Sequence, residues 1–318
     1  MRLFLGVDGG QSGTTASIGD ENGSILGQGT AGPCNHAAAS EGRAKLERAV
    51  RQSLADACRE AGLDANTVRF AVACFGMSGG PEDKREILAS ILRTDQLVVT
   101  TDAVTALAGA TETGRGIVTI AGTGSIAFGR NAAGQSVRAG GWGYVFGDEG
   151  GAFDMARQAT RASLRMEEGW GPPTRLRDVF LEATGSATVN LMLHRFYSDE
   201  WPRPRVAALA PLVDRVAAAG DAVALEILSG AAIQLAMLAG SVRRQLWQPA
   251  ERVDVAYVGG VFRSDLLREK FRLLLEMEDG CRCGPPLHGP EQGALLEAYR
   301  QGGLNPELVS WKHRHKDA

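Results

Sequence analysis

The chain has 318 residues, 44% hydrophobic and 22% charged, which is long enough to bury a core in each of two domains. Its formal net charge of −3 argues against a surface for nucleic acid or anionic membrane, and the one basic cluster, Trp311–Lys316, is expected to be a solvated tail. No stretch approaches the roughly 20 apolar residues of a membrane span, and Asp8 comes too early for a signal peptide. Five scattered cysteines favour a reduced cytoplasmic protein over a disulfide framework.

Strands and helices alternate in the first third of the chain. Arg2–Val7 is apolar and β-rich, Thr14–Ile18 resumes strand character, and Asn22-Gly23 is a strong hairpin signal, so we expect an antiparallel hairpin at the start. Apolar residues at helical spacing predict a helix over Ser40–Ala61 that stops at Gly62. The elements expected next are a buried strand over Val68–Phe75, a helix over Pro81–Leu92, and a strand over Leu97–Thr101 that ends at Asp102.

The pattern then restarts. Gly116–Ala121 predicts a strand, Gly122–Ser125 a tight glycine-hydroxyl turn, and Ile126–Arg130 a returning strand, which repeats the architecture of residues 3–18. The remaining elements are mostly helical. Helices are expected at Gly150–Met166, Arg205–Ala219, Asp221–Trp247, Ser264–Leu275 and Pro290–Gln301, and a strand is expected at Val253–Gly260. Alternating strands and helices with two similar openings predict an α/β fold of two domains.

Three glycine-hydroxyl turns follow predicted strands: DGGQSGTT from Asp8, AGTGS from Ala121, and VGGVFRS from Val258. Glycine lets the backbone approach an anion closely, while N–H and hydroxyl groups donate hydrogen bonds to it. The first turn has neither the lysine of a P-loop nor the third glycine of a dinucleotide motif. Each turn alone is equally compatible with a simple hairpin, but three at strand ends favour phosphate binding.

Together these turns resemble the sugar kinase/actin/Hsp70 ATPase superfamily, and within it the N-acetylglucosamine kinases and the BadF/BadG type of ATPase. The resemblance runs from Leu5 to about Tyr299 and is weaker over Ser163–Pro211. It implies an α/β protein of two actin-like (ribonuclease H-like) domains with a nucleotide and sugar cleft between them. The expected domains are 1–112, joined by the C-terminal helix at about 290–303, and 113–289 with a helical insertion. Their closure would exclude water from the reaction.

The resemblance assigns ATP to the three turns and Mg²⁺ to Asp8. Asp8 would face a hydrated Mg²⁺ that neutralises the β- and γ-phosphates, although a carboxylate capping a turn is an alternative interpretation. Two departures from the family are Gln11 in place of a glycine and Ser12 in place of a threonine. The nucleotide-binding residues expected are Gly9, Gly10, Gln11, Ser12, Gly13, Thr14, Gly122, Thr123, Gly124, Ser125, Gly220, Gly259, Gly260 and Ser264.

Asp102 is the candidate general base. It ends one predicted strand and opens a helix, which places it at the edge of a sheet where ligands bind in α/β folds. Sugar kinases of the resembled type use this aspartate to accept the proton of the attacking hydroxyl. Without the resemblance, a helix cap would be the better interpretation of Asp102.

The stretch GGWGYVFGDEGGAFDMA, Gly140–Ala156, resembles the GWG…GDEGS signature of N-acetylglucosamine kinases, with Gly151 where a serine is common. Sugar sites combine an aromatic wall with carboxylates that accept hydroxyl hydrogen bonds. A helix N-terminus carrying favourable acids is the alternative interpretation. The resemblance carries sugar binding to Asn35, Gly141, Trp142 and Asp148, with Glu149 adjacent and Asp102 contacting the reacting hydroxyl.

The resemblance therefore implies an ATP-dependent amino-sugar kinase, active on the 6-hydroxyl of N-acetylglucosamine and expected to be a cytoplasmic homodimer. Glucosamine, N-acetylmuramic acid and N-acetylmannosamine remain alternative substrates. An ATPase activator of a 2-hydroxyacyl-CoA dehydratase shares the fold but needs cysteines for an iron–sulfur cluster, and none follows AGTGS or GGWG. A sugar-binding regulator would leave Asp102 unexplained. A zinc-containing repressor-type kinase would need more cysteines than Cys281 and Cys283 provide.

Overall fold

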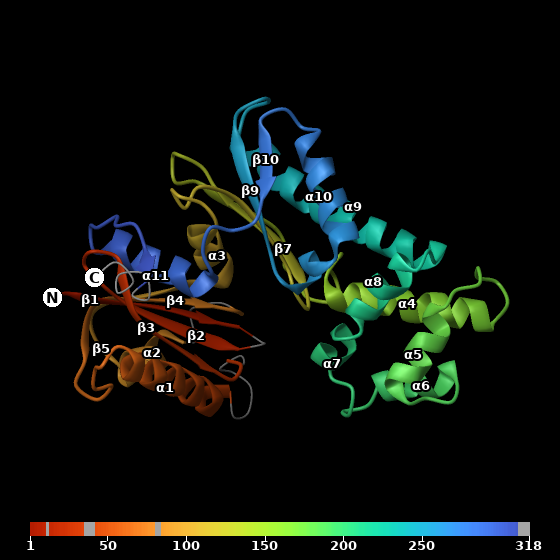
Figure 1. Ribbon diagram of the computed structural model, residues 1–318, viewed down its shortest axis with the longest axis horizontal. Helices are drawn as coiled ribbons and strands as arrows, with labels where there is room; N and C mark the ends of the chain where they lie inside the picture. Colours follow the sequence, from red (N-terminus) through yellow and green to blue (C-terminus); the bar gives the residue numbers. More distant parts are fainter. Residues whose placement is uncertain (11–12, 35–41, 80–83, 311–318) are drawn as a thin grey trace, which may run out of the picture. The chain divides into compact units, whose positions relative to one another are not determined.

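The computed structural model describes residues 1–10, 13–34, 42–79 and 84–310. The chain forms two compact units, Met1–Arg115 with Pro286–Ala318, and Gly116–Pro285 (Figure 1). Each unit has one mixed sheet with helices, so the predicted α/β class is confirmed. Three of the predicted site residues, Gln11, Ser12 and Asn35, lie outside the described residues, as does the basic tail.

The sheet of the first unit has the strand order β11-β3-β2-β1-β4-β5. β1 pairs antiparallel with β2, which confirms the predicted hairpin, and parallel with β4, which in turn pairs parallel with β5. The strands are β1 (Leu3–Gly9), β2 (Thr14–Asp20), β3 (Ser24–Ala31), β4 (Arg69–Met77), β5 (Arg93–Thr101) and β11 (Val309–Ser310). The helices are α1 (Gly42–Glu60), α2 (Arg85–Ile91), α3 (Asp102–Ala110) and α11 (Pro290–Gln301).

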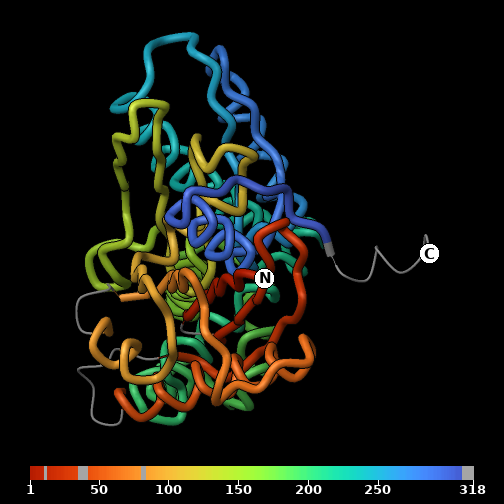
Figure 2. Tube along the Cα trace, turned by 90° about the vertical axis from the view of Figure 1, so that its left-hand side faces the viewer, coloured from red at the N-terminus to blue at the C-terminus, as the bar shows by residue number. Residues whose placement is uncertain are grey.

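Helices cover the two faces of this sheet because side chains alternate along β1. Leu5 and Val7 belong to a cluster with the buried face of α1. Phe4 points the other way and packs on Tyr299 of α11, with ring centroids 4.7 Å apart. Figure 2 shows the C-terminal segment, in blue, beside the red N-terminal strands. Residues from both ends of the chain therefore build one core.

The sheet of the second unit has the order β10-β9-β6-β7-β8, and its first hairpin, β6–β7, repeats the β1–β2 arrangement. β6 pairs parallel with β9 as β1 does with β4. The strands are β6 (Gly116–Ala121), β7 (Ser125–Arg130), β8 (Ser136–Gly140), β9 (Val253–Val258) and β10 (Cys281–Gly284). The helices are α4 (Ala152–Glu167), α5 (Leu176–Thr184), α6 (Val189–Phe196), α7 (Arg203–Ala207), α8 (Ala210–Ala218), α9 (Ala222–Leu246), the 3₁₀ helix η1 (Gly260–Arg263) and α10 (Asp265–Glu276).

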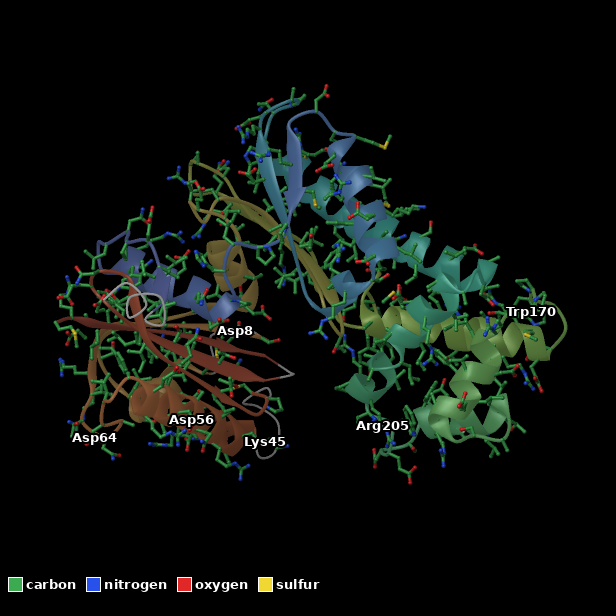
Figure 3. All side chains as sticks on the ribbon, viewed as in Figure 1. Asp8, Lys45, Asp56, Asp64, Trp170 and Arg205 are labelled. Atoms are coloured by element: carbon green, nitrogen blue, oxygen red, sulfur yellow. The ribbon has the colours of Figure 1, made fainter. Side chains whose placement is uncertain are left out.

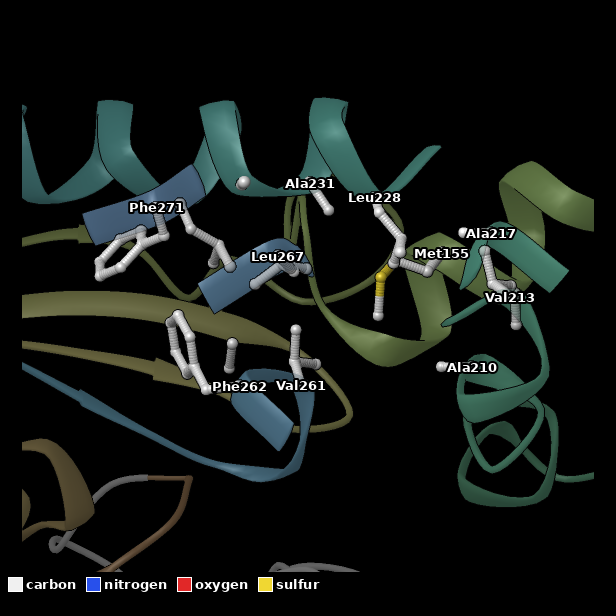
Figure 4. Close-up of a cluster of buried hydrophobic side chains, with 14 of the residues drawn as sticks. Met155, Ala210, Val213, Ala217, Leu228, Ala231, Val261, Phe262, Leu267 and Phe271 are labelled. Carbon is white, nitrogen blue, oxygen red and sulfur yellow. The ribbon is translucent and has the colours of Figure 1, made fainter. Parts of the chain in front are cut away.

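One continuous core joins η1, α4, α8, α9 and α10 in the second unit (Figure 4). Phe262 of η1 and Phe271 of α10 pack with ring centroids 5.0 Å apart. Met155 of α4 lies beside Leu228 of α9, and small alanines such as Ala231 let the elements approach closely. This packing fixes η1, which lies within the third predicted glycine turn, Val258–Ser264.

Several predicted elements differ from the structure. The single helix expected over Arg205–Ala219 is two helices, α7 and α8, because Pro211 lacks an N–H donor and suits only the first turn of a new helix. The strand expected from Leu97 begins at Arg93. β8, β10, α5 and α6 were not predicted. The helix expected over Pro81–Leu92 is described only as α2, since residues 80–83 are outside the described residues.

The expectation that no stretch approaches a membrane span was wrong, because one helix, α9, is long and apolar enough for a span when judged by its length and composition alone. α9 has 25 residues with a mean hydropathy of 1.8 over its most apolar window, of which 39% is buried inside the chain. Asp221 caps the helix, since its carboxylate accepts the Ala224 N–H at 3.0 Å. Buried helices of soluble proteins pass the same length test, and α9 contributes Leu228, Leu235 and Val242 to the core.

Candidate active site

Three parallel strands end together in the first unit. Gly9 of β1 pairs in register with Met77 of β4, which pairs with Thr101 of β5. Asp8 and Asp102 therefore lie at the same edge of the sheet, the carboxyl-terminal edge at which ligands bind in α/β proteins. Asp8 is labelled at this position in Figure 3. The Ser78 N–H donates to the Gly9 carbonyl at 3.0 Å, which joins the two strand ends.

The carboxyl group of Asp8 lies in an unfavourable electrostatic environment. Burial, followed by the charges of Asp102 and Glu291, raises its pKa from 3.8 to about 7. The charges of Asp102 and Glu291 thus add to burial in disfavouring the ionised form of Asp8. A divalent cation bound at Asp8 would favour the ionised form of this carboxyl group.

Mg²⁺ fits this donor set. It prefers oxygen ligands and usually keeps several waters while one or two carboxylates and substrate phosphates complete its shell. Among the described residues, no group of three His, Cys, Asp or Glu side chains forms a metal cluster, so a protein-only cage is not present there. A single carboxylate from Asp8, acting through water, agrees with that chemistry, and the metal would neutralise phosphate charge when bound.

Asp102 begins α3 with its carboxylate already oriented. Its Oδ1 accepts the Ala103 N–H at 2.9 Å, and the Ser78 hydroxyl donates to the same carboxyl group. Burial raises the pKa of Asp102, while these hydrogen bonds and the positive charge of Lys84 oppose that rise. Lys84 is 1% exposed. The cap position of α3 is Thr101, so Asp102 is the first residue of the helix and not its cap, and its carboxyl group is able to accept a proton.

The described part of the first glycine turn is tightly folded. The Gly10 N–H donates to the Gly13 carbonyl at 2.9 Å. The Thr14 hydroxyl donates to the Gly32 carbonyl at 2.9 Å and lies 2.7 Å from the Cys34 sulfur. A Cβ on Gly9 would stand 2.7 Å from the Met77 sulfur, so a larger residue there would have to displace the end of the Met77 side chain. The structure therefore uses the Thr14 hydroxyl to hold the turn in shape.

The second and third turns adjoin each other in the second unit. β6 and β9 run parallel, with Ile120 paired to Val258, so Gly122–Ser125 and Gly259–Gly260 follow the same sheet edge. Gly259 has φ of 112°, and a Cβ there would stand 2.3 Å from the Ala121 carbonyl oxygen. Only glycine tolerates both conditions. Two of the predicted nucleotide turns are thus brought together by the fold.

Backbone contacts hold the Gly122–Ser125 turn against α4. The Ala152 N–H donates to the Gly122 carbonyl at 2.8 Å, and the Phe153 N–H donates to the Thr123 carbonyl at 3.1 Å. The Ser125 hydroxyl donates to the Glu149 carbonyl at 2.6 Å. The turn is therefore joined to the signature stretch, and its shape depends on that stretch.

Asp148 lies under this turn. Its Oδ1 accepts the Ser125 N–H at 3.3 Å, and a Cβ on Gly124 would stand within 2.4 Å of the same carboxylate. The residue has φ of 62°, a strained left-handed backbone for a non-glycine residue. The structure thus shows Asp148 supporting Gly124–Ser125, and its predicted contact with a sugar stays a prediction.

Arg203, at the start of α7, was missed at the sequence level. Its guanidinium donates to the Asp148 carboxylate, and it lies 5.0 Å from the Tyr144 ring centroid. The aspartate is almost fully buried and the arginine largely so, which makes the pair hard to break. No local pattern could have revealed this contact, because 55 residues separate the partners. The one feature of the local sequence that marked this position was an arginine directly after Pro202.

The aromatic part of the signature is exposed. Trp142 is 67% exposed, and Tyr144, Val145 and Phe146 are also exposed. The Arg138 guanidinium lies 4.6 Å from the Trp142 ring centroid. The Gly141 N–H donates to the Ser125 carbonyl at 3.0 Å with φ of 72°, which ties the start of the signature to the phosphate turn. An indole ring exposed beside a held turn is available to contact a ligand.

Two predicted nucleotide residues have structural roles in the second unit. The Ser264 hydroxyl accepts the Leu267 N–H at 3.3 Å as the cap of α10 and also donates to Asp214 of α8. Gly220, with φ of 86°, makes the turn between α8 and α9 and is exposed. The assignment of Ser264 and Gly220 to the nucleotide site stays a prediction.

Comparison with known proteins places this geometry in a class of ATP-using phosphotransferases. The chain is 29% identical to an N-acetylmuramic acid/N-acetylglucosamine kinase of Clostridium acetobutylicum, over 87% of this chain and 91% of the relative. It is 31% identical to an N-acetyl-D-glucosamine kinase of Dictyostelium discoideum, over 84% and 89%. The solved structure of a protein proposed to be an N-acetylglucosamine kinase of Chromobacterium violaceum superposes with a TM-score of 0.78 at 28% identity, covering 93% and 98%.

The model of the BadF/BadG/BcrA/BcrD ATPase family matches residues 5–298. The chain therefore belongs to the BadF/BadG/BcrA/BcrD ATPase family. This confirms the resemblance stated from the glycine turns, the predicted two-domain fold, and the prediction of an ATP-dependent enzyme of the kinase type.

Proposed function

We propose that the chain is an ATP-dependent amino-sugar kinase that transfers the γ-phosphoryl group to the 6-hydroxyl of N-acetylglucosamine. The observation that carries the proposal is the convergence of Asp8 and Asp102 at the ends of parallel strands β1 and β5. One carboxyl group is suited to a hydrated Mg²⁺ and the other to a proton. The names of the two curated relatives support an N-acetylated amino sugar as the acceptor.

Asp102 acts as the general base in this proposal. It accepts the proton of the 6-hydroxyl as the sugar oxygen bonds to the γ-phosphorus, and the bond to the bridging oxygen breaks to release ADP. Burial keeps the pKa of Asp102 raised, which makes its carboxylate a better proton acceptor than a solvated one. Ser78 fixes its orientation through the hydrogen bond to the same carboxyl group.

The glycine turns hold ATP and the signature stretch holds the sugar. The backbone of Gly9–Gly10, Gly122–Ser125 and Gly259–Gly260 approaches the nucleotide closely, and Asp8 orients the hydrated Mg²⁺. Trp142 forms an aromatic wall for the sugar, with Asp148 and Glu149 accepting hydroxyl hydrogen bonds. Asn35, Gln11 and Ser12 complete the proposed sites from outside the described residues. The five free thiols agree with a cytoplasmic enzyme.

The test is a coupled kinase assay with ATP, Mg²⁺ and N-acetylglucosamine on three proteins: wild type, Asp102→Asn and Asp102→Ala. We expect wild-type turnover and a loss of at least about 10²-fold in kcat for both variants, as for removal of a general base. ATP affinity, measured by calorimetry, should stay within about threefold of wild type in both. An active Asp102→Ala variant would contradict the proposal.

N-acetylmuramic acid is the second candidate substrate. The Clostridium relative is named for both sugars, and it covers most of this chain. Since specificity is the ratio of kcat/KM values, a panel of N-acetylglucosamine, N-acetylmuramic acid, glucosamine and N-acetylmannosamine decides the matter. A higher kcat/KM for N-acetylmuramic acid would favour a role in using cell-wall sugars.

A further inference from the structure

A lysine side chain is buried near the edge of the sheet where Asp8 and Asp102 lie. Lys84 directly precedes α2, has helical backbone angles (φ −108°, ψ −23°) and is 1% exposed. Because β4 and β5 are parallel, the chain must return from their carboxyl-terminal edge before β5 begins, and α2 lies on that return. Side chains of a helix tilt toward its N-terminus, which directs the Lys84 side chain toward the carboxyl-terminal edge.

The packing of α2 brings Lys84 under the first glycine turn. Leu88, one helical turn further on, belongs to the buried cluster that contains Met77 and Cys34. Residues four apart lie on the same side of a helix, so Lys84 faces this cluster. Burial raises the pKa of the Cys34 thiol, and the positive charge of Lys84 opposes that rise. The Met77 and Cys34 sulfurs would stand 2.7 Å and 3.4 Å from a Cβ on Gly9, so the cluster lies directly against the turn.

Lys84 and Asp102 reach the strand ends from opposite faces of the sheet. α2 lies on the face that α1 covers, with Ile87 in the same buried cluster, whereas α3 lies on the other face (Figure 1). Thr105 of α3 packs on that other face, where a Cβ on Gly76 would stand 2.1 Å from its hydroxyl. Helices on opposite faces come together only beyond the strand ends. The electrostatic effect of Lys84 on Asp102 therefore places the two groups beside each other there.

The ionisation of Asp102 depends on the groups around it. Burial raises the pKa of its carboxyl group. The hydrogen bonds from Ala103 and Ser78 and the positive charge of Lys84 oppose that rise. The negative charge of Asp8, on β1, favours the protonated form, just as the charge of Asp102 raises the pKa of Asp8. Because only an ionised carboxylate can accept a proton, a cation beside Asp102 serves a general base directly.

We propose that Lys84 is a positioning residue for the general base, whose buried ammonium group keeps the Asp102 carboxylate ionised and held at the strand ends. The inference rests on the proposed function, since Lys84 acts in the reaction through Asp102. A buried ammonium group is costly unless an anion lies beside it, and Asp102 supplies that anion. The first glycine turn lacks the lysine of a P-loop, and Lys84 brings a positive charge to the same edge from α2.

The first test compares pH profiles of kcat/KM for N-acetylglucosamine in wild type, Lys84→Met and Lys84→Arg. Removal of a nearby opposite charge raises a carboxyl pKa, so the acidic midpoint of Lys84→Met should lie about one pH unit or more above that of wild type. Above this midpoint its kcat/KM should return to within about threefold of wild type. Lys84→Arg keeps the charge and should keep the wild-type midpoint. A merely structural role would lower activity at every pH without moving the midpoint.

The second test does not depend on turnover. Carbon-13 NMR of aspartate-labelled protein without nucleotide follows the Asp102 carboxyl signal, which is assigned by its loss in Asp102→Asn. Its titration midpoint should rise by about one unit in Lys84→Met. The matched control, Lys270→Met, removes a lysine that bonds Ser229 in the second unit and should leave the midpoint unchanged. If wild type phosphorylates no amino sugar, the proposed function is wrong, and this titration still decides whether Lys84 acts on Asp102.

ATP affinity separates this role from a direct contact with the nucleotide. By calorimetry, Lys84→Met should bind ATP within about threefold of wild type, because its effect is confined to the base. Lys84→Gln, which also removes the charge, takes its place if the methionine variant does not fold. A loss of tenfold or more in ATP affinity, or an Asp102 midpoint that is unchanged in both charge-removing variants, would overturn the proposal.

Discussion

Replacing Asp8 by asparagine should stabilise the protein while abolishing its activity. The pKa of Asp8 is raised from 3.8 to about 7 by burial and by Asp102 and Glu291. Because one pKa unit corresponds to about 1.36 kcal/mol, the ionised carboxylate lowers the free energy of unfolding by about 4 kcal/mol at pH 8. The amide of asparagine has the same shape as the carboxylate but needs new hydrogen-bond partners. We therefore expect Asp8→Asn to recover about half of this lost free energy of unfolding, or about 2 kcal/mol.

The effect has a defined pH dependence. Below pH 3.8 the carboxyl group of Asp8 is protonated in both the folded and the unfolded protein, so its ionisation does not change the free energy of unfolding. Between 3.8 and about 7 the folded state holds the proton more tightly, and the free energy of unfolding falls as pH rises. Differential scanning calorimetry without Mg²⁺ should show the Tm of Asp8→Asn about 4–8 °C above wild type at pH 8, with the gap narrowing towards pH 4.

Asp64→Asn is the matched control. Asp64 is an exposed acid in the loop after α1, whose pKa is lowered by the Asn66 backbone N–H and nearby side chains (Figure 3). Its replacement should leave Tm unchanged or slightly lower at pH 8. If Asp8→Asn melts at or below the wild-type temperature at pH 8 without Mg²⁺, the inferred repulsion among the three acids is refuted. Added Mg²⁺ should raise the Tm of wild type and not that of the variant.

Four further predictions concern the remaining site residues. kcat/KM should rise with pH through the raised pKa of Asp102, and a profile already flat at pH 4 would contradict this. Arg203→Met should cost about 3 kcal/mol in urea unfolding by leaving Asp148 buried without its partner, and adding Asp148→Asn should recover most of the loss. Gly259→Ala should cost about 3 kcal/mol because of its positive φ and the Ala121 carbonyl, and an unchanged midpoint would contradict that account. Trp142→Ala should raise KM for the sugar about tenfold with little change in kcat, as for loss of uniform binding.

Local sequence patterns were enough to predict the first hairpin of each unit. Alternating apolar strands and the Asn22-Gly23 turn predicted the first hairpin, and the repeat of that order at Gly116–Arg130 corresponds to the β6–β7 hairpin. Asp102 could be placed at a strand end because the predicted strand Leu97–Thr101 stops there and a helix begins. The helical region around α5 to α7 was predicted poorly, because its short helices are set by packing on α4 and by prolines rather than by a long periodic stripe.

Contacts distant in sequence could not be predicted. The Arg203–Asp148 pair, the position of Glu291 near Asp8, and the burial of Lys84 near Asp102 all depend on the assembled fold. Ser264 caps α10, a role that its position before Asp265 also allows, and its predicted contact with the nucleotide stays a prediction. Local sequence shows which groups are present, while tertiary packing decides which of them meet.

The position of the transferred phosphate tests the central claim most directly. The purified chain with ATP, Mg²⁺ and N-acetylglucosamine should give a product whose phosphorus couples to the two protons on carbon 6 in a proton–phosphorus NMR correlation. The same reaction with Asp102→Asn should give no such signal in the same time. Coupling to the anomeric proton, or release of inorganic phosphate at the same rate with and without sugar, would contradict the account.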